Sequence, residues 1–476
     1  MRSIGKQATL GLIVGTRGFF NSELALEGRR QLLAKLEREG YDYVILPEDA
    51  TPTGAVETRE DAKKCARLFS DRRDEIDGVV VVLPNFSDEL GVVQTLEMAK
   101  LSVPVLVQGS DDDPGKLDLR HRRDAFCGKL SVCNNLYQYG IPFSDTTCHT
   151  CAIESDVFSQ ALARFSGICR VVRGLRGARI GAIGARPGAF QTMRVSEKLL
   201  QASGVTVVPV DLSEILFAAQ RLDPNAAEVK AKVAEIREYG RIPSTIPDET
   251  VARQAALSVV VDRWVGENEI DAVGVQCWTS VQENYGCGAC LTMSMLSERL
   301  IPAGCEVDIG GVVSMYALVL ATGKPAALVD WNNNYGDDRD KCICTHCSSY
   351  PRSFVGGEVE ISTQSVLGAA LGEENCFGAV KGKVAPGPMS FCRVSTDDRR
   401  GLVKAYVGEG EFTDDPCNMD GGIAVCRIAG LQQLMKFMCA NGFEHHGAMV
   451  RSHVADAVAE AFRTYLGWEV YRHQAG

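Results

Sequence analysis

The sequence predicts an α/β protein in which two parallel-sheet, Rossmann-like domains precede a smaller, largely antiparallel β domain. Two patterns carry this prediction. Continuous apolar runs alternate with amphipathic segments over 9–109 and again from 178, as in parallel strands covered by helices. Towards the C-terminus, short apolar runs are separated by Gly, Pro and Asp, which favours antiparallel strands. We therefore expect domains at 1–172, 173–350 and 351–476, and a length of 476 residues agrees with more than one core.

The first domain is expected to repeat strand and helix several times. The predicted strands are 9–16, 41–47, 78–84 and 103–109, and the predicted helices between them are 22–40, 58–76 and 88–100. Gly40 would cap the first helix. Because parallel strands end at one edge of a sheet, the polar residues after the first three strands, which include Thr16, Arg17, Glu48 and Asn85, should meet there.

The second and third domains are predicted from the same kind of pattern. A strand that enters a Gly-rich turn over 178–190 should lead into a helix over 191–204. Strands at 205–212 and 271–278 and an apolar helix at 309–322 should follow. In the last third, 380–414 suits a small antiparallel sheet or barrel, and 455–467 is predicted to form a closing helix.

The composition is that of an ordinary folded protein. Hydrophobic residues make up 45% of the chain, charged residues make up 23%, and the mean hydropathy is −0.04. The net charge of −11 and the lack of a basic block argue against a nucleic-acid partner. The apolar run near the N-terminus is too short for a secretory core or a membrane span, so we expect a cytoplasmic protein with no membrane partner.

Eighteen cysteines are scattered along the chain, and we expect reduced thiols that mostly pack as small apolar side chains. Three clusters could bind zinc or form redox pairs: CHTC at 148–151, CGAC at 287–290 and CICTHC at 342–347. They leave open one alternative function, that of a zinc-stabilised binding or regulatory protein in which the cysteine clusters hold zinc.

A second alternative comes from the glycines of the turn after residue 180. Gly181, Gly184 and Gly188 follow a predicted strand, as in a dinucleotide-binding turn, although they do not match the usual G-x-G-x-x-G spacing. This arrangement leaves open a nicotinamide-dependent oxidoreductase.

Carboxylates and histidines beside buried segments suggest a metal site. Glu306 lies at the start of the apolar helix, and Asp330 follows Leu328-Val329 within a predicted buried strand. His346 and the pair His445-His446 supply imidazoles in a chain with seven histidines. Such a mixed oxygen and nitrogen donor set suits a divalent cation of intermediate hardness, such as Mn²⁺.

Several segments of the second half resemble the L-fucose and L-arabinose isomerase family. They are WTSVQENYGCGACLTMSML (278–296), IPAGCEVD (301–308), a strand bearing Asp330, a following HC (346–347), GPMSFCR (387–393) and the late double histidine. The first half resembles the family only in its α/β character.

This resemblance implies metal-dependent aldose–ketose isomerisation through an ene-diolate intermediate. The family's metal ligands, carried onto this chain, are Glu306, Asp330 and His446, with Mn²⁺ as the expected ion although other divalent cations could serve. The two acids also form the family's proton-transfer pair, so Glu306 and Asp330 are the predicted catalytic residues. The resemblance further implies a homo-hexamer or trimer-based homo-oligomer in which the N-terminal domain of a neighbouring subunit covers the site.

The residues that would contact the sugar are predicted partly from position and partly from the resemblance. Gln276 and Trp278 end a strand just before the matching segment, where polar and aromatic contacts to a sugar would be natural, and His346 could match a further histidine of the arabinose branch. Arg17, at the end of the first strand, could recognise an anionic group. The expected substrate is a hexose, a 6-deoxyhexose, a 6-anionic (for example sulfonated) hexose or a pentose. Cys344-Thr345 stands where the family has a tryptophan, which leaves the identity of the sugar open.

Overall fold

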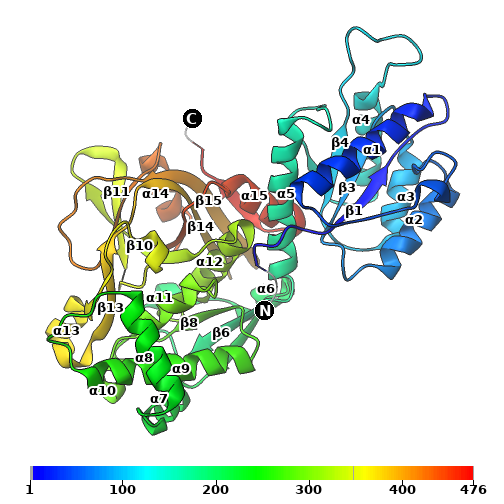
Figure 1. Cartoon of the computed structure of the whole chain (residues 1–476). Coiled ribbons are helices and arrows are strands. Elements are labelled where there is room, and N and C mark those ends of the chain that lie inside the picture. Colours follow the sequence, from blue (N-terminus) through cyan, green and yellow to red (C-terminus); the bar gives the residue numbers. More distant parts are fainter. Residues whose placement is uncertain (1–3, 347, 475–476) are drawn as a thin grey trace. The chain divides into compact units, whose positions relative to one another are not determined.

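The computed structural model describes residues 4–346 and 348–474, which form two compact units. The N-terminal unit comprises 6–173 together with 460–467, and the main unit comprises the other described residues. Each unit contains one parallel sheet with helices, and the main unit adds a larger, mostly antiparallel sheet (Figure 1). The predicted fold class is therefore confirmed, whereas the division into three domains at residues 172 and 350 stays a prediction.

The N-terminal unit is built on a five-stranded parallel sheet in the order β2-β1-β3-β4-β5. Its strands are β1 (Leu10–Val14), β2 (Tyr43–Ile45), β3 (Gly78–Leu83), β4 (Val105–Gly109) and β5 (Ser144–Asp145), and its helices are α1 (Ser22–Glu39), α2 (Arg59–Asp71), α3 (Glu89–Ala99), α4 (Ala125–Gln138) and α5 (Asp156–Leu175). Along β3, Val79 and Val81 join one apolar cluster while Val80 and Val82 join another. Both faces of this sheet are therefore buried, which explains the continuous apolar runs of its strands.

Two details of this unit agree with the sequence. Helix α1 ends at Gly40, whose φ of 75° lies in the left-handed region that a C-cap glycine adopts readily. At the carboxyl edge of the sheet, the Asn85 side chain donates a hydrogen bond to Thr16 Oγ1 at 3.1 Å. The predicted meeting of these polar residues at one edge is confirmed for the ends of β1 and β3.

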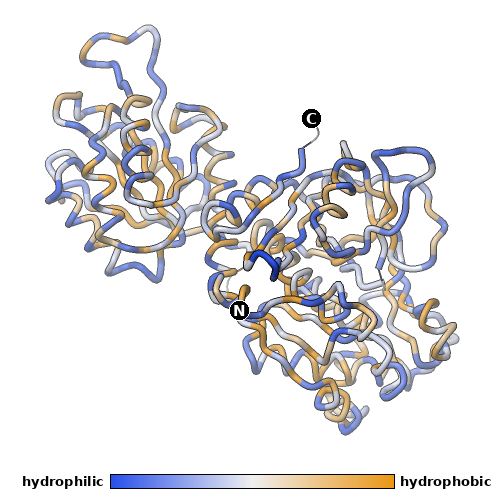
Figure 2. Tube along the Cα trace, turned by 180° about the vertical axis from the view of Figure 1, so that it is seen from behind, coloured by the Kyte–Doolittle hydropathy of each residue, from blue (hydrophilic) through white to orange (hydrophobic). Residues whose placement is uncertain are grey.

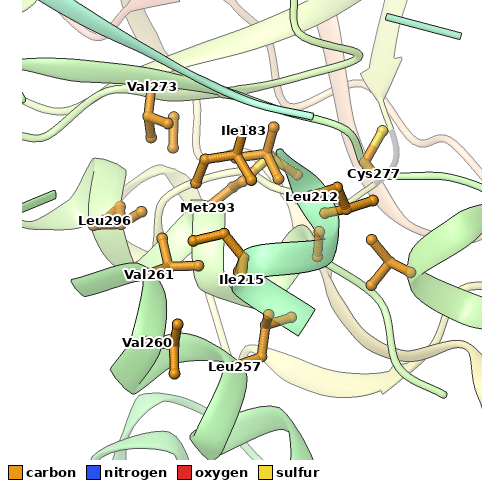
Figure 3. Packing of buried hydrophobic residues seen from close by; sticks show 14 of the residues in the cluster. Ile183, Leu212, Ile215, Leu257, Val260, Val261, Val273, Cys277, Met293 and Leu296 are labelled. Atoms are coloured by element: carbon orange, nitrogen blue, oxygen red, sulfur yellow. The ribbon is translucent and has the colours of Figure 1, made fainter. Parts of the chain in front are cut away.

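The main unit begins with a four-stranded parallel sheet in the order β7-β6-β8-β9. Its strands are β6 (Arg179–Ile183), β7 (Thr206–Val210), β8 (Ala272–Val275) and β9 (Ala303–Cys305), and the helices around it are α6 (Glu197–Ala202), α7 (Leu212–Arg221), α8 (Ala227–Tyr239), α9 (Asp248–Glu267), α10 (Ser280–Tyr285) and α11 (Cys290–Glu298). Figure 3 shows side chains of this sheet, such as Ile183 and Val273, in one apolar cluster with Ile215, Leu257 and Leu296 of the helices. This packing holds the ends of β8 and β9 in fixed positions.

The larger sheet has nine strands in the order β12-β13-β16-β11-β10-β17-β14-β15-β18. Its strands are β10 (Ala326–Tyr335), β11 (Asp338–His346), β12 (Glu360–Thr363), β13 (Phe377–Lys383), β14 (Gly387–Asp397), β15 (Leu402–Phe412), β16 (Gly422–Arg427), β17 (His446–Val450) and β18 (Glu469–Arg472), with α13 (Ser365–Leu371), α14 (Leu431–Ala440) and α15 (Ala455–Glu460) between them. Because β15 also pairs with β16, the strands from β16 to β15 close into a barrel. The sheet starts at Ala326, before residue 350, so β10 and β11 belong to it.

Helix α12 (Ile309–Thr322) spans the range that the sequence predicts. Residues 309–321 are all buried, and the helix contacts β8 and β9 of the parallel sheet as well as β10, β14 and β17 of the barrel. A helix enclosed on all sides has no polar face, which accounts for its uniform apolar sequence. Figure 2 shows the same hydrophobic character along the inner strands and helices of the unit. None of the described helices is long and apolar enough to cross a bilayer.

Two predicted helices are shorter than expected. Within 191–204 the structure has only a single 3₁₀ turn at Gln191–Met193 and the short helix α6, because the segment after β6 first forms a long loop. The closing segment forms α15 and then a π-helical turn at Ala461–Tyr465. The Tyr465 hydroxyl lies 2.8 Å from Ser144 Oγ, so this late turn packs within the N-terminal unit.

Candidate active site

Four of the predicted site residues meet where the parallel sheet and the barrel of the main unit come together. Glu306 follows β9, and Asp330, His346 and His446 lie on β10, β11 and β17. Strands β10 and β17 are antiparallel neighbours, and their register places Asp330 directly opposite His446. The contact between residues more than one hundred positions apart is therefore a consequence of strand pairing.

The distances within this group are short. His446 Nε2 lies 3.3 Å from Asp330 Oδ1 and 3.8 Å from Glu306 Oε2. One donor atom each from Glu306, His346 and His446 lies within 4.8 Å of the others, and the same holds for Asp330, His445 and His446. His446 is common to both groups and is 0% exposed, whereas the His445 side chain is 40% exposed.

The backbone places Glu306 in an unusual conformation. Its φ is 64° and that of Val307 is 53°, which is the left-handed region that side chains with a Cβ adopt at a cost of about 1 kcal/mol or more. Glu306 is nevertheless buried, and its Oε1 accepts a hydrogen bond from Trp278 Nε1 at 3.3 Å. In this conformation the Glu306 carboxylate lies beside the His446 ring.

Asp308 and Arg393 lie behind His446 and form a buried ion pair. Asp308 Oδ2 lies 2.8 Å from His446 Nδ1, and Asp308 Oδ1 accepts a hydrogen bond from Arg393 Nη2 at 3.0 Å. Arg393 Nε donates to Glu444 Oε2 at 3.0 Å. Burial alone would raise the pKa of the Asp308 carboxyl, but Arg393 and His446 outweigh it and hold that pKa well below its usual range.

The surroundings of the His446 ring favour its neutral form. Burial lowers the pKa of His446 to about 4, and the neighbouring Asp308 only partly opposes this shift. Burial also lowers the pKa of His445, with partial opposition from Asp330. A neutral imidazole is the form of histidine that binds a metal ion.

The donor set fits a divalent cation. His446 Nε2 is buried and has no hydrogen-bond partner among residues 4–346 and 348–474, although two carboxylate oxygens lie near it. Ligands bound about 2.1 Å from one ion lie roughly 3–4 Å from each other. The distances from His446 Nε2 to the nearest carboxylate oxygens of Asp330 and Glu306 fall in that range. Two carboxylates with an imidazole suit a cation of intermediate hardness.

An aromatic wall lies beside these groups. The Phe190 ring is 5.3 Å from the Trp278 ring and 5.5 Å from the His445 ring, measured between centroids. Phe190 belongs to the long loop after β6. Gln276, which was predicted to contact the sugar, accepts a hydrogen bond from the backbone N–H of Ala185 at 2.9 Å and so supports this same loop.

Arg17 belongs to the N-terminal unit. Its guanidinium forms an ion pair with Glu89, donates a hydrogen bond to the Ser87 carbonyl at 3.3 Å and lies 4.6 Å from the centre of the Phe86 ring. Its predicted role in substrate recognition stays a prediction.

The structure gives no support to the two alternative functions. Neither CHTC (148–151) nor CGAC (287–290) belongs to a group of three or more possible metal ligands in the described part of the chain. In CICTHC, Cys342 and Cys344 pack in the apolar core of the barrel, and Cys347 lies outside the described residues. After β6, the Gly-rich turn does not lead directly into a helix, which a dinucleotide-binding turn requires to place a pyrophosphate at a helix N-terminus.

Three residues near the site were missed from the sequence. Asp308 and Arg393 are predicted only as parts of the segments IPAGCEVD and GPMSFCR, and Phe190 has no predicted role. A single Arg within the buried strand of 387–397 is a detectable signal, because a fully buried charge needs a partner. No comparable signal marks Phe190, because its position depends on the course of a loop.

Comparisons with known proteins relate the chain to sugar isomerases. Residues 11–176 match the N-terminal domain of fucose/sulfoquinovose isomerases, and residues 344–474 match the C-terminal domain of L-fucose isomerases. A sulfoquinovose isomerase of Priestia aryabhattai is 26% identical over 402 residues, which is 83% of this chain and 85% of that protein. Sulfoquinovose isomerases of Alkalicoccus urumqiensis and of a Clostridium species are 23% and 24% identical over 377 and 374 residues, covering 77% and 74% of this chain and 80% and 77% of those proteins.

Fold, site and comparisons together define an enzyme that interconverts an aldose and a ketose sugar. The class is thus that of the intramolecular oxidoreductases that act on sugars. Within this class, the chain belongs to the L-fucose isomerase family.

Proposed function

We propose that this enzyme is a metal-dependent isomerase of a 6-sulfonated hexose such as sulfoquinovose. The observation that carries the metal dependence is the buried His446 Nε2, which faces the carboxylates of Glu306 and Asp330. The sulfonated substrate is supported by the relatives described above, all of which are sulfoquinovose isomerases, and by the family that the N-terminal half matches.

Glu306 and Asp330, each with a carboxylate oxygen within 4 Å of His446 Nε2, would hold the cation together with that histidine, and Mn²⁺ is the natural choice. A divalent cation bound there would act as a Lewis acid that stabilises the negative charge developing on the sugar oxygens. His446 contributes a neutral nitrogen donor, so the two carboxylates can balance the charge of the cation. His346, whose ring centroid lies 4.6 Å from that of His446, stands beside this set as a candidate contact to the sugar.

Glu306 and Asp330 would also transfer the protons. Isomerisation moves one proton between neighbouring carbons through an ene-diolate, while a second proton moves between the two oxygens. Trp278 holds Glu306 Oε1, and the Asp330 side chain is 27% exposed against 5% for Glu306. Asp330 is therefore the more accessible of the two acids, and Glu306 is the more firmly held.

A ketose-formation assay tests this function. Purified enzyme, with and without added Mn²⁺, is incubated with sulfoquinovose, glucose, L-fucose and L-arabinose in D₂O, and NMR follows both ketose and the deuterium taken up from solvent. We expect Mn²⁺-dependent conversion of the sulfonated sugar and a large loss of turnover in Glu306→Gln, with retained folding. Glu411→Gln is the matched control, because that exposed carboxylate pairs with Arg427 on the barrel. Near-normal turnover in Glu306→Gln would contradict the proton-transfer role.

The sulfonate would be recognised by Arg17 from a neighbouring subunit of a hexameric or trimer-based assembly. Arg17→Ala should then raise the KM for sulfoquinovose far more than that for a neutral hexose, whereas Arg30→Ala, at a 71%-exposed arginine, should affect neither. Equal losses on both sugars would remove the idea of anion recognition.

Mixing experiments test whether subunits share the site. If Arg17 and Glu306 act together from different chains, assemblies formed from Arg17→Ala and Glu306→Gln chains should regain part of the activity that each variant lacks. Light scattering on the same samples measures the size of the assembly. A monomeric, fully active enzyme would refute the shared site.

A further inference from the structure

We propose that Asp308 and Arg393 are positioning residues of the active site, which fix the tautomer of His446 so that the Nε2 lone pair faces Glu306 and Asp330. This inference rests on the proposed function, since it gives His446 Nε2 a cation to bind. Nothing in the resemblance to known families assigns a role to these two residues.

The tautomer follows from the contact between Asp308 and the ring. Asp308 Oδ2 lies 2.8 Å from His446 Nδ1, and both side chains are at most 1% exposed. An ionised carboxylate can only accept hydrogen bonds, so the ring proton must be on Nδ1. In a neutral imidazole the other nitrogen then carries the lone pair, and that nitrogen is the one 3.3 Å from Asp330 Oδ1.

Arg393 makes Asp308 an obligate acceptor. Its guanidinium binds both carboxylate oxygens, with Nη2 donating to Oδ1 at 3.0 Å and Nη1 donating to Oδ2. Asp308 Oδ1 also accepts from the backbone N–H of Gly311 at 3.0 Å, so that it caps helix α12. Because both oxygens of Asp308 already accept hydrogen bonds, a proton on the carboxyl group would displace one of these donors. The ionised form is therefore favoured.

The sequence leaves room for this arrangement. A Cβ at Gly311 would lie 2.4 Å from Asp308 Oδ2 and 2.9 Å from Arg393 Nη1, and a Cβ at Gly310 would lie 2.7 Å from the Val394 carbonyl. Any residue larger than glycine at 311 would therefore push the carboxylate away from the histidine. The pair of glycines after Asp308 thus permits both the guanidinium and the ring to reach one carboxylate.

A purely structural role for Asp308 and Arg393 would not require the contact with His446. The ion pair of Asp308 and Arg393 would by itself be enough to connect α12 to β14. An ion pair with only this structural role would not depend on the tautomer of a neighbouring histidine. The contact of Asp308 Oδ2 with His446 Nδ1 instead connects this ion pair to the ring whose other nitrogen faces Glu306 and Asp330. Carboxylates in this position behind a metal-binding histidine set its orientation and its affinity for the ion.

The experiment uses full-length, metal-free protein with ¹⁵N-labelled histidine. Two-bond ¹H–¹⁵N correlation spectra report which ring nitrogen carries the proton, and His446→Gln assigns the signal. We expect a protonated Nδ1 and an unprotonated Nε2 in the wild type. In Asp308→Asn the amide oxygen can still accept hydrogen bonds from the Gly311 N–H and from Arg393 Nη2, as Oδ1 does in the wild type. The NH₂ group then takes the place of Oδ2 and donates to His446 Nδ1, so the ring proton should move to Nε2. Mn²⁺ affinity, measured by calorimetry, should fall roughly 10–100-fold.

Asp211→Asn is the matched control. Asp211 caps α7 by accepting from the Ser213 N–H at 2.8 Å, and Asn caps a helix equally well, so neither the tautomer nor the Mn²⁺ affinity should change. A wild-type ring with its proton on Nε2, or an Asp308→Asn variant with unchanged tautomer and affinity, would overturn the inference. Should that variant not fold, the wild-type spectrum still decides. A chain that isomerises no sugar would refute the proposed function, while the tautomer result would stand on its own.

Discussion

Replacing Arg393 with methionine should strongly destabilise the main unit. Methionine keeps much of the length of the side chain and removes its charge, so the change isolates the guanidinium. Arg393 is 1% exposed and lies between two carboxylates, Asp308 and Glu444. Its loss leaves both acids in the interior without their counter-charge.

The magnitude follows from the number of partners. The guanidinium donates twice to Asp308 and once to Glu444, and Ser395 is the other donor to that glutamate, at 2.8 Å. Removing one partner from a buried ion pair costs roughly 3–5 kcal/mol, because the remaining charge stays uncompensated. We expect a loss of about this size in the free energy of unfolding of the metal-free protein at pH 7.

The loss should shrink as the pH falls. In the wild type the pKa of Asp308 lies well below its usual range, so its contribution to stability is present above that range and is lost only as the pH falls through the folded pKa. In Arg393→Met, burial is no longer outweighed by the guanidinium, and the pKa of Asp308 should rise. Protonation in the folded state then relieves the penalty, so the variant should differ less from the wild type at pH 5 than at pH 7.

Urea unfolding followed by tryptophan fluorescence measures this effect. All four tryptophans, at 264, 278, 331 and 468, lie in the main unit, so the signal reports on the unit that contains Arg393. Arg427→Met is the control, because that arginine forms an exposed pair with Glu411 and its loss should move the midpoint much less. A variant that unfolds at the wild-type urea concentration, or whose deficit is the same at both pH values, would refute the reasoning.

Three further predictions concern the metal, a glycine and the late turn. Treatment with EDTA should abolish isomerisation and lower the urea midpoint, and added Mn²⁺ should restore both, since a ligand that binds only the folded state stabilises it. Gly311→Ala should weaken Mn²⁺ binding, as measured by calorimetry, by displacing the Asp308 carboxylate, whereas Gly266→Ala, with open space around its Cβ, should not. Tyr465→Phe removes the hydroxyl that bonds Ser144 and should destabilise the N-terminal unit by about 1 kcal/mol, seen as faster hydrogen exchange in β4.

Local patterns predicted most of the helices and strands. Helix α12 matches its predicted range because its limits are marked in the sequence. A continuous apolar run lies between an aspartate that suits the N-cap and a glycine that suits the C-cap. The predicted helix over 191–204 begins only at Glu197 apart from one 3₁₀ turn, because the loop that starts at the predicted Gly-rich turn continues further and is held by tertiary contacts. Among these contacts are the ring of Phe190 against Trp278 and the N–H of Ala185 on Gln276.

The sequence was enough to predict which residues could bind a metal ion, but not which of them lie in contact. Glu306, Asp330 and His446 are recognisable as donors, yet nothing in their spacing brings β10 beside β17. Strand pairing across a long separation is a property of the whole fold. Asp308 and Arg393 could not be predicted for the same reason. An aspartate at a helix N-cap is common, and the sequence does not show that a buried arginine from a distant strand donates to its carboxylate.

The parallel sheet and the barrel of the main unit must pack together before the donor residues lie close to one another. Glu306 comes from the edge of the parallel sheet, whereas Asp330 and His446 come from the barrel, and α12 lies between them. The left-handed backbone at Glu306 and Val307 is unfavourable in isolation, but the hydrogen bond from Trp278 and the cap by Asp308 on Gly311 hold this turn in place. Because Asp308 contacts both the helix and His446, the same residue that ends the strained turn also orients the ligand from the barrel. A cation at this point would therefore bind both layers and favour their docking, which is why its removal should be visible in stability as well as in activity.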